Sequence, residues 1–344
     1  MSLSFLPFDD VWKMRIDHPY SLVVKDGPLV WSCGQCPLDG DGAVLFSGDL
    51  MAQAEAVAGF IAHYLRDMGC AVSAIGRLVV YYVKTREGDA EALAALFHAR
   101  LGPAFLVLPV AVPHFYYDGM LIEVDVYGST SPRTSSEHVD AATGLRLSVV
   151  DAGPFVWANL IVPSTPVDAG ATERLIAEAG LSRDCLLAEQ WFGSSDAENT
   201  VRMPFDGAAA SAELIFAGTP VRKERRTIAP PSFPDARVAL TFACSREHFH
   251  IAAADESGTA DIVGQTGAIM EAVDLTLRAK HLGFADIRKA TTYYVSGSTA
   301  EELHDNMQIR NRYYARPGPA STGLPVEGFA RSRASIRVQM LGAL

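Results

Sequence analysis

The chain has 344 residues, of which 49% are hydrophobic and 20% are charged. This composition is typical of a globular protein with a sizeable core, and the length allows two or three domains. The net charge of −11 argues against a general nucleic-acid binder, because such a protein needs a basic face to release counterions from phosphates.

The cysteines and the N-terminal residues indicate in which cellular compartment the protein is expected. Five cysteines are an odd number, and they lack the spacing of a disulfide framework, which is typical of a reducing environment. Residues 1–10 contain no basic segment followed by an apolar run, so we expect no signal peptide. No apolar stretch is long enough to cross a bilayer. We therefore expect a cytoplasmic protein without a membrane partner.

The first 130 residues predict an α+β domain with the element order β-β-α-β-α-β-β. Asp49 is a good N-cap, and the apolar residues after it recur every three or four positions until Gly69, which indicates an amphipathic helix. Each helix has one apolar stripe, so we expect both helices on one face of a single sheet. The predicted elements are a hairpin at 22–31, a helix at 50–68, a strand at 77–83, a helix at 87–101, and strands at 105–108 and 121–127.

The middle of the chain is less regular. A polar stretch at 131–144 predicts a domain linker. Residues 145–232 contain three strand-like runs and a helical pattern at 172–179. They form either a partial third copy of the first domain or extra strands of the last sheet. The basic run at 222–226 predicts a solvated connector.

Residues 233–344 repeat the plan of the first domain. Tyr-Tyr-Val occurs at 81–83 and again at 293–295, and Glu-Ala-Val precedes it each time at a similar distance. Such long-range similarity indicates a duplicated fold. The predicted elements are a hairpin, a helix at 264–282, a strand at 287–295, a helix at 299–315 and two closing strands.

The first domain resembles the Rid family (reactive intermediate deaminase, also called YjgF-like). The segments that carry this resemblance are residues 32–40, the helix start at 48–53, the strand at 79–83 and the closing strand at 122–125. The last domain resembles a more diverged Rid unit through residues 264–265, 291–295, 310–314 and 319–322. The resemblance implies two chorismate-mutase-like α+β units in tandem, which cover nearly two thirds of the chain.

The resemblance also implies a function. Many Rid proteins hydrolyse imines or enamines of amino acids to keto acids and ammonia, without a metal or cofactor. Members with a single unit are trimers with a cleft between neighbouring units. We therefore expect a hydrolase of the deaminase type that acts on a small carboxylated metabolite. We also expect self-association, or a pseudo-trimer of Rid units.

Two residues are central to the chemistry of the family. An arginine after the second helix holds the substrate carboxylate, but its expected positions fall near Leu108 and at Ser321. A glutamate in the last strand helps to position water; it is kept as Glu123, whereas the last domain has Arg337 there. Desolvation in an apolar strand would raise the pKa of Glu123, which suits a general acid or base. The alternative is that Glu123 faces solvent from the other side of the strand.

Other side chains could replace the missing arginine. Arg333 and Arg337 alternate along a predicted strand and could share one face, where they would bind a carboxylate or protect a sheet edge. Arg310 lies on the second helix of the last domain. Hydroxyl groups that could bind substrate, or be purely structural, belong to Ser321, Thr322, Tyr82 and Tyr294. We predict no metal site, because neither the Cys33–Cys36 pair nor the His248–His250 pair has further ligands at suitable spacing.

Two other functions fit the sequence. A non-catalytic metabolite-binding protein would explain the missing arginine. A chorismatase-like hydrolase or lyase is also possible, because residues 292–297 and 319–323 resemble the diverged half of the chorismatases. That family carries its regular half last, whereas here the regular half comes first.

Overall fold

A computed structural model describes residues 3–8, 12, 16–163, 168–195, 197, 199–204, 208–295 and 300–344. Parts of two segments used above, residues 1–10 and 292–297, lie outside these ranges. Within the described ranges, no helix is long and apolar enough to cross a membrane.

The first unit has the predicted element order. Asp49 caps the first helix, since its Oδ1 accepts a hydrogen bond of 3.1 Å from Ala52 N, and the helix buries the predicted apolar stripe. The strands pair in the order β1-β2-β3-β6-β4-β5, with β4 and β5 parallel. The elements are β1 (Leu3–Pro7), β2 (Ser21–Asp26), β3 (Leu29–Ser32), α1 (Leu50–Asp67), β4 (Ile75–Tyr82), α2 (Asp89–Leu101), β5 (Leu106–Ala111) and β6 (Ile122–Ser129).

The last unit repeats this arrangement. Its strands pair in the order β13-β14-β15-β19-β16-β17, and β16 and β17 are again parallel. The predicted α+β class with helices on one face of each sheet is confirmed. The elements are β13 (Arg222–Ile228), β14 (Val238–Cys244), β15 (His248–Asp255), α4 (Ile262–Ala279), β16 (Ile287–Val295), α5 (Ala300–Asn311), β17 (Ala320–Val326), β18 (Gly328–Phe329) and β19 (Ile336–Ala343).

The middle segment forms a sheet of its own instead of extending the last one. Its strands pair in the order β7-β8-β9-β12-β10-β11, which is the strand order of the other two units. The described part of this segment has one helix where the other units have two. The elements are β7 (Thr134–Val139), β8 (Arg146–Asp151), β9 (Phe155–Val162), α3 (Ala169–Glu178), β10 (Leu186–Gly193), β11 (Thr200–Arg202) and β12 (Ala210–Ala217).

Two predicted connections are strands. The polar stretch predicted as a linker contains β7, and the basic run predicted as a solvated connector lies in β13. Both strands lie at the edge of a sheet and are largely exposed. Edge strands commonly carry charged and polar side chains, so they lack the apolar alternation that indicates a buried strand. The domain boundaries and the association with other chains stay predictions.

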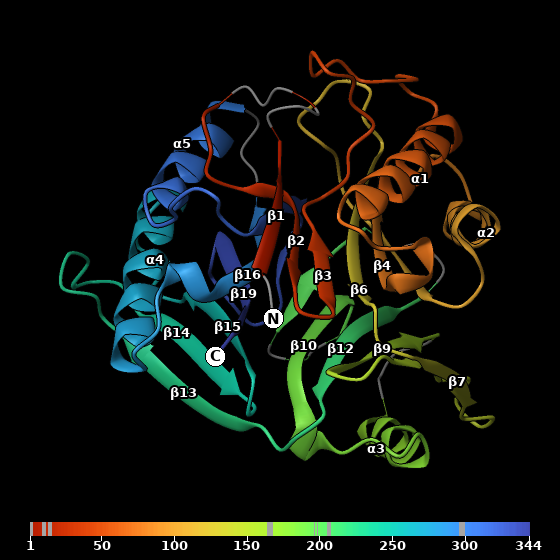
Figure 1. The fold of residues 1–344 in the computed structure, drawn as a ribbon. Helices are drawn as coiled ribbons and strands as arrows, with labels where there is room; N and C mark the ends of the chain where they lie inside the picture. Colours follow the sequence, from red (N-terminus) through yellow and green to blue (C-terminus); the bar gives the residue numbers. More distant parts are fainter. Residues whose placement is uncertain are drawn as a thin grey trace.

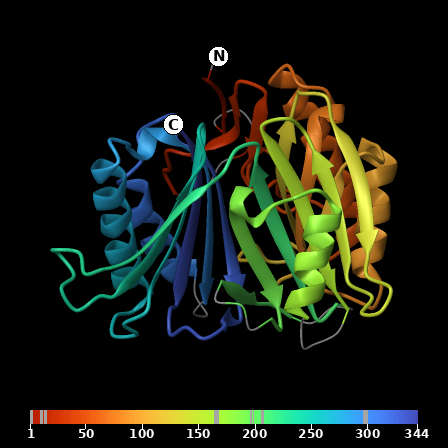
Figure 2. The same ribbon diagram turned by 90° about the horizontal axis from the view of Figure 1, so that it is seen from below.

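The strands of the three units face a common interior, and the helices cover them from outside; those of the first and last units join into one continuous sheet. Figure 1 shows α1 and α2 on one side of the molecule, α4 and α5 on the opposite side and α3 below; Figure 2 shows the same arrangement from below. An apolar cluster with members from all three units, including Tyr81, Trp157 and Tyr293, fills the space between the sheets. A Cβ atom on Gly76 would overlap the ring of Trp157, so glycine is required where the first unit meets the middle one.

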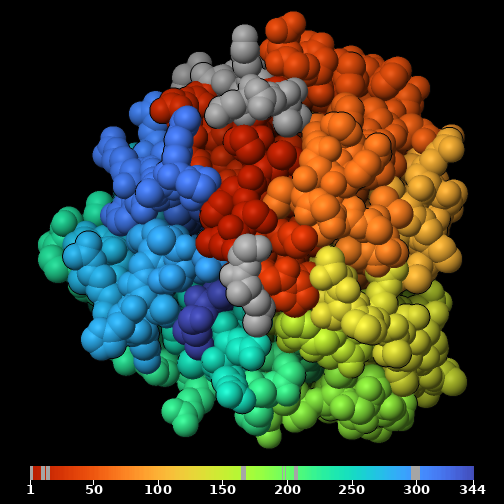
Figure 3. Space-filling view, in the orientation of Figure 1, coloured from red at the N-terminus to blue at the C-terminus, as the bar shows by residue number. Residues whose placement is uncertain are grey.

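The N-terminal strands connect the first and last units. β17 pairs with β2 in parallel through Ala320 and Ser21, and the Ser21 hydroxyl donates a 2.7 Å hydrogen bond to the Gly318 carbonyl. In the space-filling view, the red N-terminal segment lies between the orange first unit and the blue C-terminal segment (Figure 3). The two units that resemble each other in sequence are therefore neighbours in space.

Buried charges connect the units inside the molecule. Lys289 begins the regular pairing of β16, and its Nζ lies 2.8 Å from Asp125 Oδ1 on β6 of the first unit. Arg77 is at the equivalent position of β4, and it lies 3.0 Å from Glu213 on β12 of the middle segment. In both cases a cation of one unit meets a carboxylate of the next.

The third junction between units is uncharged. β10 has Ala188 where the other two units have their cations. Gln339 of β19 donates a hydrogen bond to Gln190 of β10. The three junctions therefore occupy equivalent positions but differ in chemistry.

We expect Lys289→Met to lower the free energy of unfolding by about 3–5 kcal/mol, because it leaves the Asp125 carboxylate buried without its cation. Urea denaturation measures the loss, and adding Asp125→Asn should recover much of it. Lys280→Met is the matched control, since Lys280 pairs with Glu224 at the surface and should matter much less. Equal losses for the two lysine variants would contradict this interpretation.

Candidate functional site

A cavity of about 110 Å³ lies between the last unit and the first. The last unit contributes α5 and β17, and the first unit contributes β6 and the loop after β3. Four of the predicted site residues line it together: Glu123, Tyr294, Arg310 and Ser321. Aromatic side chains at the cavity include Trp12, Tyr20, Phe115, Tyr116 and Tyr117.

Glu123 points into this cavity from β6 and is 8% exposed. The alternative of a solvent-facing side chain is therefore wrong. Burial and, to a smaller extent, the neighbouring Asp125 raise the pKa of Glu123 from 4.5 to about 8, although Lys289 acts in the opposite direction. At neutral pH the carboxyl group is therefore mainly protonated and uncharged.

The loop after β3 holds the carboxyl group of Glu123 in place. Gln35 N donates a 2.8 Å hydrogen bond to the Val124 carbonyl, and Val124 N donates one of 3.1 Å to the Gln35 carbonyl. This double contact brings Gly34 against the Glu123 side chain, where a Cβ atom would overlap Oε1, Cδ and Cγ. The glycine in this sequence motif therefore has a packing reason, since any other residue would displace the carboxyl group.

The two cysteines beside this loop are buried at the cavity. Burial raises the pKa of the Cys33 and Cys36 thiols well above the usual value, so both stay protonated. A protonated thiol is a poor nucleophile and a poor metal ligand. Within the described ranges, no group of three or more His, Cys, Asp or Glu side chains could hold a metal ion.

Arg310 is the cation of the site. Its side chain is 3% exposed, and its Nε donates to Asn306 Oδ1 and its Nη1 to Thr292 Oγ1, both at 2.9 Å. These partners are neutral, and no carboxylate of the described residues forms an ion pair with Arg310. A buried guanidinium without a counter-charge is unfavourable unless an anion joins it. This makes Arg310 a candidate for binding the negative group of a ligand.

Hydroxyl groups surround the guanidinium. Burial raises the pKa of Tyr20, and nearby Arg310 and Ser321 act in the opposite direction, so these three side chains lie close together. Tyr294 donates a long 3.5 Å hydrogen bond to the Gly323 carbonyl. Its ring stacks on the ring of Tyr116, with 5.9 Å between the two ring centroids. The site therefore combines one cation, several neutral hydroxyl donors and one protonated carboxyl.

The other predicted site residues lie elsewhere. Thr322 is buried in the interior, where it donates to Asp125 Oδ1 at 2.5 Å and accepts from Lys289 Nζ at 2.6 Å. Arg337 lies over the Phe329 ring at 4.9 Å. Arg333 precedes β19 and packs beside Gly258, so the prediction that it shares a strand face with Arg337 is wrong. Tyr82 lines a different cavity.

Strand register defines the equivalent positions in the three units. Glu123 pairs with Tyr81, Ser211 with Phe192 and Arg337 with Tyr293, so the three units place a glutamate, a serine and an arginine at one position. On the neighbouring strand, the register equates Ser321 with Val107, one residue from the predicted Leu108. Arg337 is thus the counterpart of the catalytic candidate, but it does not enter the same cavity.

Tyr20 and Tyr116 are site residues that the sequence did not reveal. Tyr20 lies just before β2, and Tyr116 lies in the connection between β5 and β6. Neither residue belongs to a periodic pattern or to a motif of the resemblance. The sequence signal that could have indicated them is the apolar and aromatic composition of the connection at 112–117, because such side chains normally pack against other parts of the protein.

Comparison with known proteins supports the relationship of the first unit. Residues 13–129 match the profile of the family described as Endoribonuclease L-PSP. This part of the chain belongs to the YjgF/Rid family. No curated protein sequence matches the chain significantly. Because the match to the Rid profile ends at residue 129, the Rid resemblance of the last unit and the likeness to chorismatases stay predictions.

Several solved structures of Rid proteins are similar to part of the chain. RidA from the Antarctic bacterium Psychrobacter sp. PAMC 21119 is 22% identical, over 37% of this chain and 98% of its own, with a TM-score of 0.32. Yeast Mmf1 is 16% identical over the same shares, also with a TM-score of 0.32. A YjgF/YER057c/UK114 family member from Mycobacterium tuberculosis is 18% identical, over 38% of this chain and 100% of its own, with a TM-score of 0.30.

We expect Gly34→Ala to lower the free energy of unfolding by about 1–3 kcal/mol, because its methyl group overlaps the buried Glu123 side chain. Gly59→Ala is the matched control: it lies on the exposed face of α1, and its methyl group would meet no atom within 4 Å. The Gly59→Ala variant should raise the free energy of unfolding by about 0.5–1 kcal/mol. Urea denaturation compares them, and a stabilising Gly34→Ala would refute the packing argument.

Proposed function

We propose that the cavity between the last unit and the first binds a small 2-imino acid and hydrolyses it to the 2-keto acid and ammonia. Membership of the Rid family supports a Rid-like function. The observation that carries the proposal is the presence in one cavity of a protonated Glu123 and a buried Arg310 that no carboxylate of the described residues neutralises. A neutral carboxyl group and a cation are what a carboxylated imine requires.

Arg310 takes the role of the missing family arginine. Its Nε and Nη1 are held by Asn306 and Thr292, which leaves Nη2 for the substrate carboxylate. The hydroxyls of Ser321 and Tyr20 supply further hydrogen bonds to the same group. Charge-assisted hydrogen bonds of this type are roughly twice as strong as neutral ones. The guanidinium thus comes from α5 and not from β17, where the family places it.

Glu123 acts as the acid and then as the base. Its protonated carboxyl donates a proton to the imine nitrogen as a water oxygen attacks the imine carbon, and the resulting carboxylate takes one proton from that oxygen, which gives the neutral carbinolamine and restores the acid. Glu123 then protonates the amino group as the carbon–nitrogen bond breaks and ammonia leaves, and its carboxylate removes the remaining hydroxyl proton to give the keto acid. The net reaction consumes one water, and Glu123 ends protonated. A pKa of about 8 suits both proton transfers near neutral pH.

The size of the cavity limits the substrate. Sites for drug-sized ligands usually measure about 300–1,000 Å³, whereas this cavity has about 110 Å³. Its walls include the aromatic rings of Tyr116 and Tyr294, which stack against each other. We therefore infer a substrate with a short apolar side chain, such as 2-iminobutyrate.

We expect Arg310→Met to raise the KM for 2-iminobutyrate at least tenfold, because the substrate carboxylate loses its charged partner; a lost charged hydrogen bond is worth about 1.5–3 kcal/mol. Ammonia release from enzymatically generated 2-iminobutyrate measures the effect. Arg312→Met is the matched control, since Arg312 lies just past the end of α5 and is exposed. Equal KM values in the two variants would exclude Arg310 as the carboxylate-binding residue.

We expect Glu123→Gln to lower kcat/KM at least 100-fold, because amide groups cannot exchange the proton. In the wild type, kcat/KM should stay level below pH 8 and fall tenfold per pH unit above it, as the acid form disappears. The rate-versus-pH profile of the variant should lack this inflection. An inflection that persists in the variant would assign it to another group.

The same substitution has a readout independent of activity. Because the pKa rises from 4.5 to about 8 on folding, the unfolded chain loses this proton first as pH rises. Relative to Glu123→Gln, the wild type should therefore lose stability between about pH 4.5 and 8 and no further above that range. If this trend appears but the wild type releases no ammonia, Glu123 is protonated as described and the proposed hydrolysis of 2-iminobutyrate is wrong.

A further inference from the structure

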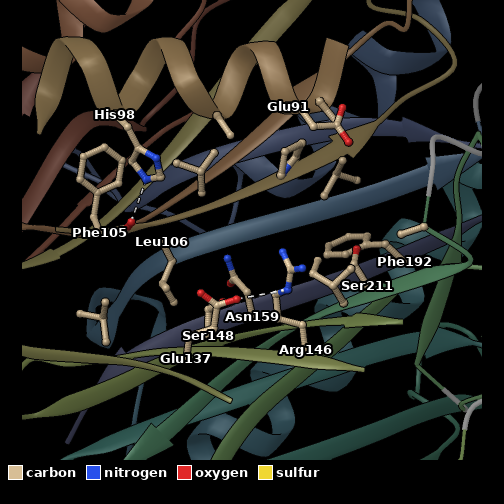
Figure 4. A pocket seen from close by; sticks show the side chains of 18 of the residues that line it. Glu91, His98, Phe105, Leu106, Glu137, Arg146, Ser148, Asn159, Phe192 and Ser211 are labelled. Atoms are coloured by element: carbon tan, nitrogen blue, oxygen red, sulfur yellow. Dashed lines mark hydrogen bonds and ion pairs between the residues drawn. The ribbon is translucent and has the colours of Figure 1, made fainter. Parts of the chain in front are cut away.

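We propose that a second cavity, between the first unit and the middle segment, binds an uncharged, mainly apolar small molecule that carries a hydrogen-bond donor. This cavity lies between α2 and β5 on one side and β7, β8 and β9 on the other (Figure 4). Its volume is about 750 Å³, within the usual range for small-molecule sites of about 300–1,000 Å³. It is separate from the cavity that contains Glu123.

The second cavity is the counterpart of the first in the repeated fold. Ser211 occupies the position of Glu123, and Val107 occupies the position of Ser321. Both residues line the second cavity, so this cavity has a serine at the position where the first cavity has its glutamate. It therefore has space for a ligand without the groups for imine hydrolysis.

Asn159 is the polar group to which we expect a ligand to bind. It lies in β9, between Ser148 of β8 and Glu213 of β12, and only 3% of it is exposed. Its Oδ1 has no hydrogen-bond partner among the described residues. Figure 4 shows the side chain directed from the sheet towards the space below α2. Buried polar atoms in native structures are normally satisfied, so an N–H or O–H donor of a ligand fits here.

The charges around this cavity argue for a neutral ligand. Arg146 pairs with Glu137 at 3.2 Å, and both side chains are 58% exposed. The ring of His98 contacts the Phe105 carbonyl at 3.1 Å. Glu91 is an exposed residue of α2. Among the described residues that line this cavity, none is a buried cation comparable to Arg310 that could bind an anion.

The remaining walls combine apolar side chains with serines and with the residues named above. The apolar side chains come from both units, and they give a ligand apolar area to bury near the amide of Asn159. The apolar lining includes Leu106, Val110, Val149, Ile161, Phe192 and Met203. A planar aromatic molecule with one N–H group combines these two requirements.

Indole is the probe for this site, and 1-methylindole is its partner without the N–H donor. Isothermal titration should show indole binding to the wild type, with 1-methylindole about 5–10-fold weaker because one hydrogen bond is lost. Asn159→Leu should remove this preference. No indole binding at millimolar concentration, or equal affinity for the two probes, would overturn the proposal.

Two further variants locate the binding and guard against misfolding. Ser211→Trp places a bulky ring against Asn159 in the second cavity and should weaken indole binding at least tenfold, while an unchanged circular dichroism spectrum and melting transition show that the variant is folded. Arg310→Met should leave indole affinity unchanged, because Arg310 lines only the first cavity. Indole binding that is lost in Arg310→Met and kept in Ser211→Trp would place the probe in the first cavity and refute the assignment.

Discussion

The arrangement of the three units depends on buried ionic contacts between neighbouring units. Lys289 meets Asp125, and Arg77 meets Glu213, at the same two positions of the repeated topology. Removing charges from water is unfavourable, so each ion is tolerated only while its partner stays in place. These contacts therefore favour one relative placement of the sheets, and both cavities lie between units that this placement brings together.

The same position of the fold differs among the three units, and this difference explains why the cavities are unequal. Glu123, Ser211 and Arg337 are equivalent by register, but of these three residues Glu123 is the one that lines a cavity together with Arg310, a buried cation that no carboxylate of the described residues neutralises. Arg337 instead lies over Phe329 of β18, which pairs with β11 at the edge of the middle sheet. Sequence divergence between repeats has thus placed the proposed acid and the proposed carboxylate-binding residue at one of the three junctions.

The sequence predicted the two outer units because their buried strands and amphipathic helices carry strong periodic signals. The burial of Glu123 was predictable as well, since it lies within an apolar strand. The middle sheet was harder, because its edge strand β7 is polar and its pattern contains one helix. Arg310 was one of several candidate arginines, and the packing shows that it is buried in the cavity with neutral partners among the described residues. The contributions of Tyr20 and Tyr116 depend on long-range contacts that no local pattern encodes.

The pairing of β17 with β2 has a consequence for synthesis on the ribosome. β1 pairs along β2 from the start of synthesis, but Ser21 bonds to Gly318 and Pro319, so this end of β2 gains its C-terminal partners only after nearly the whole chain has emerged. Until then the first unit is folded without its contact to the last unit, and the apolar surfaces between the units stay open to other nascent chains. A chain that places its first and last units side by side therefore completes its fold late, and chaperones that cover such surfaces should matter most during that interval.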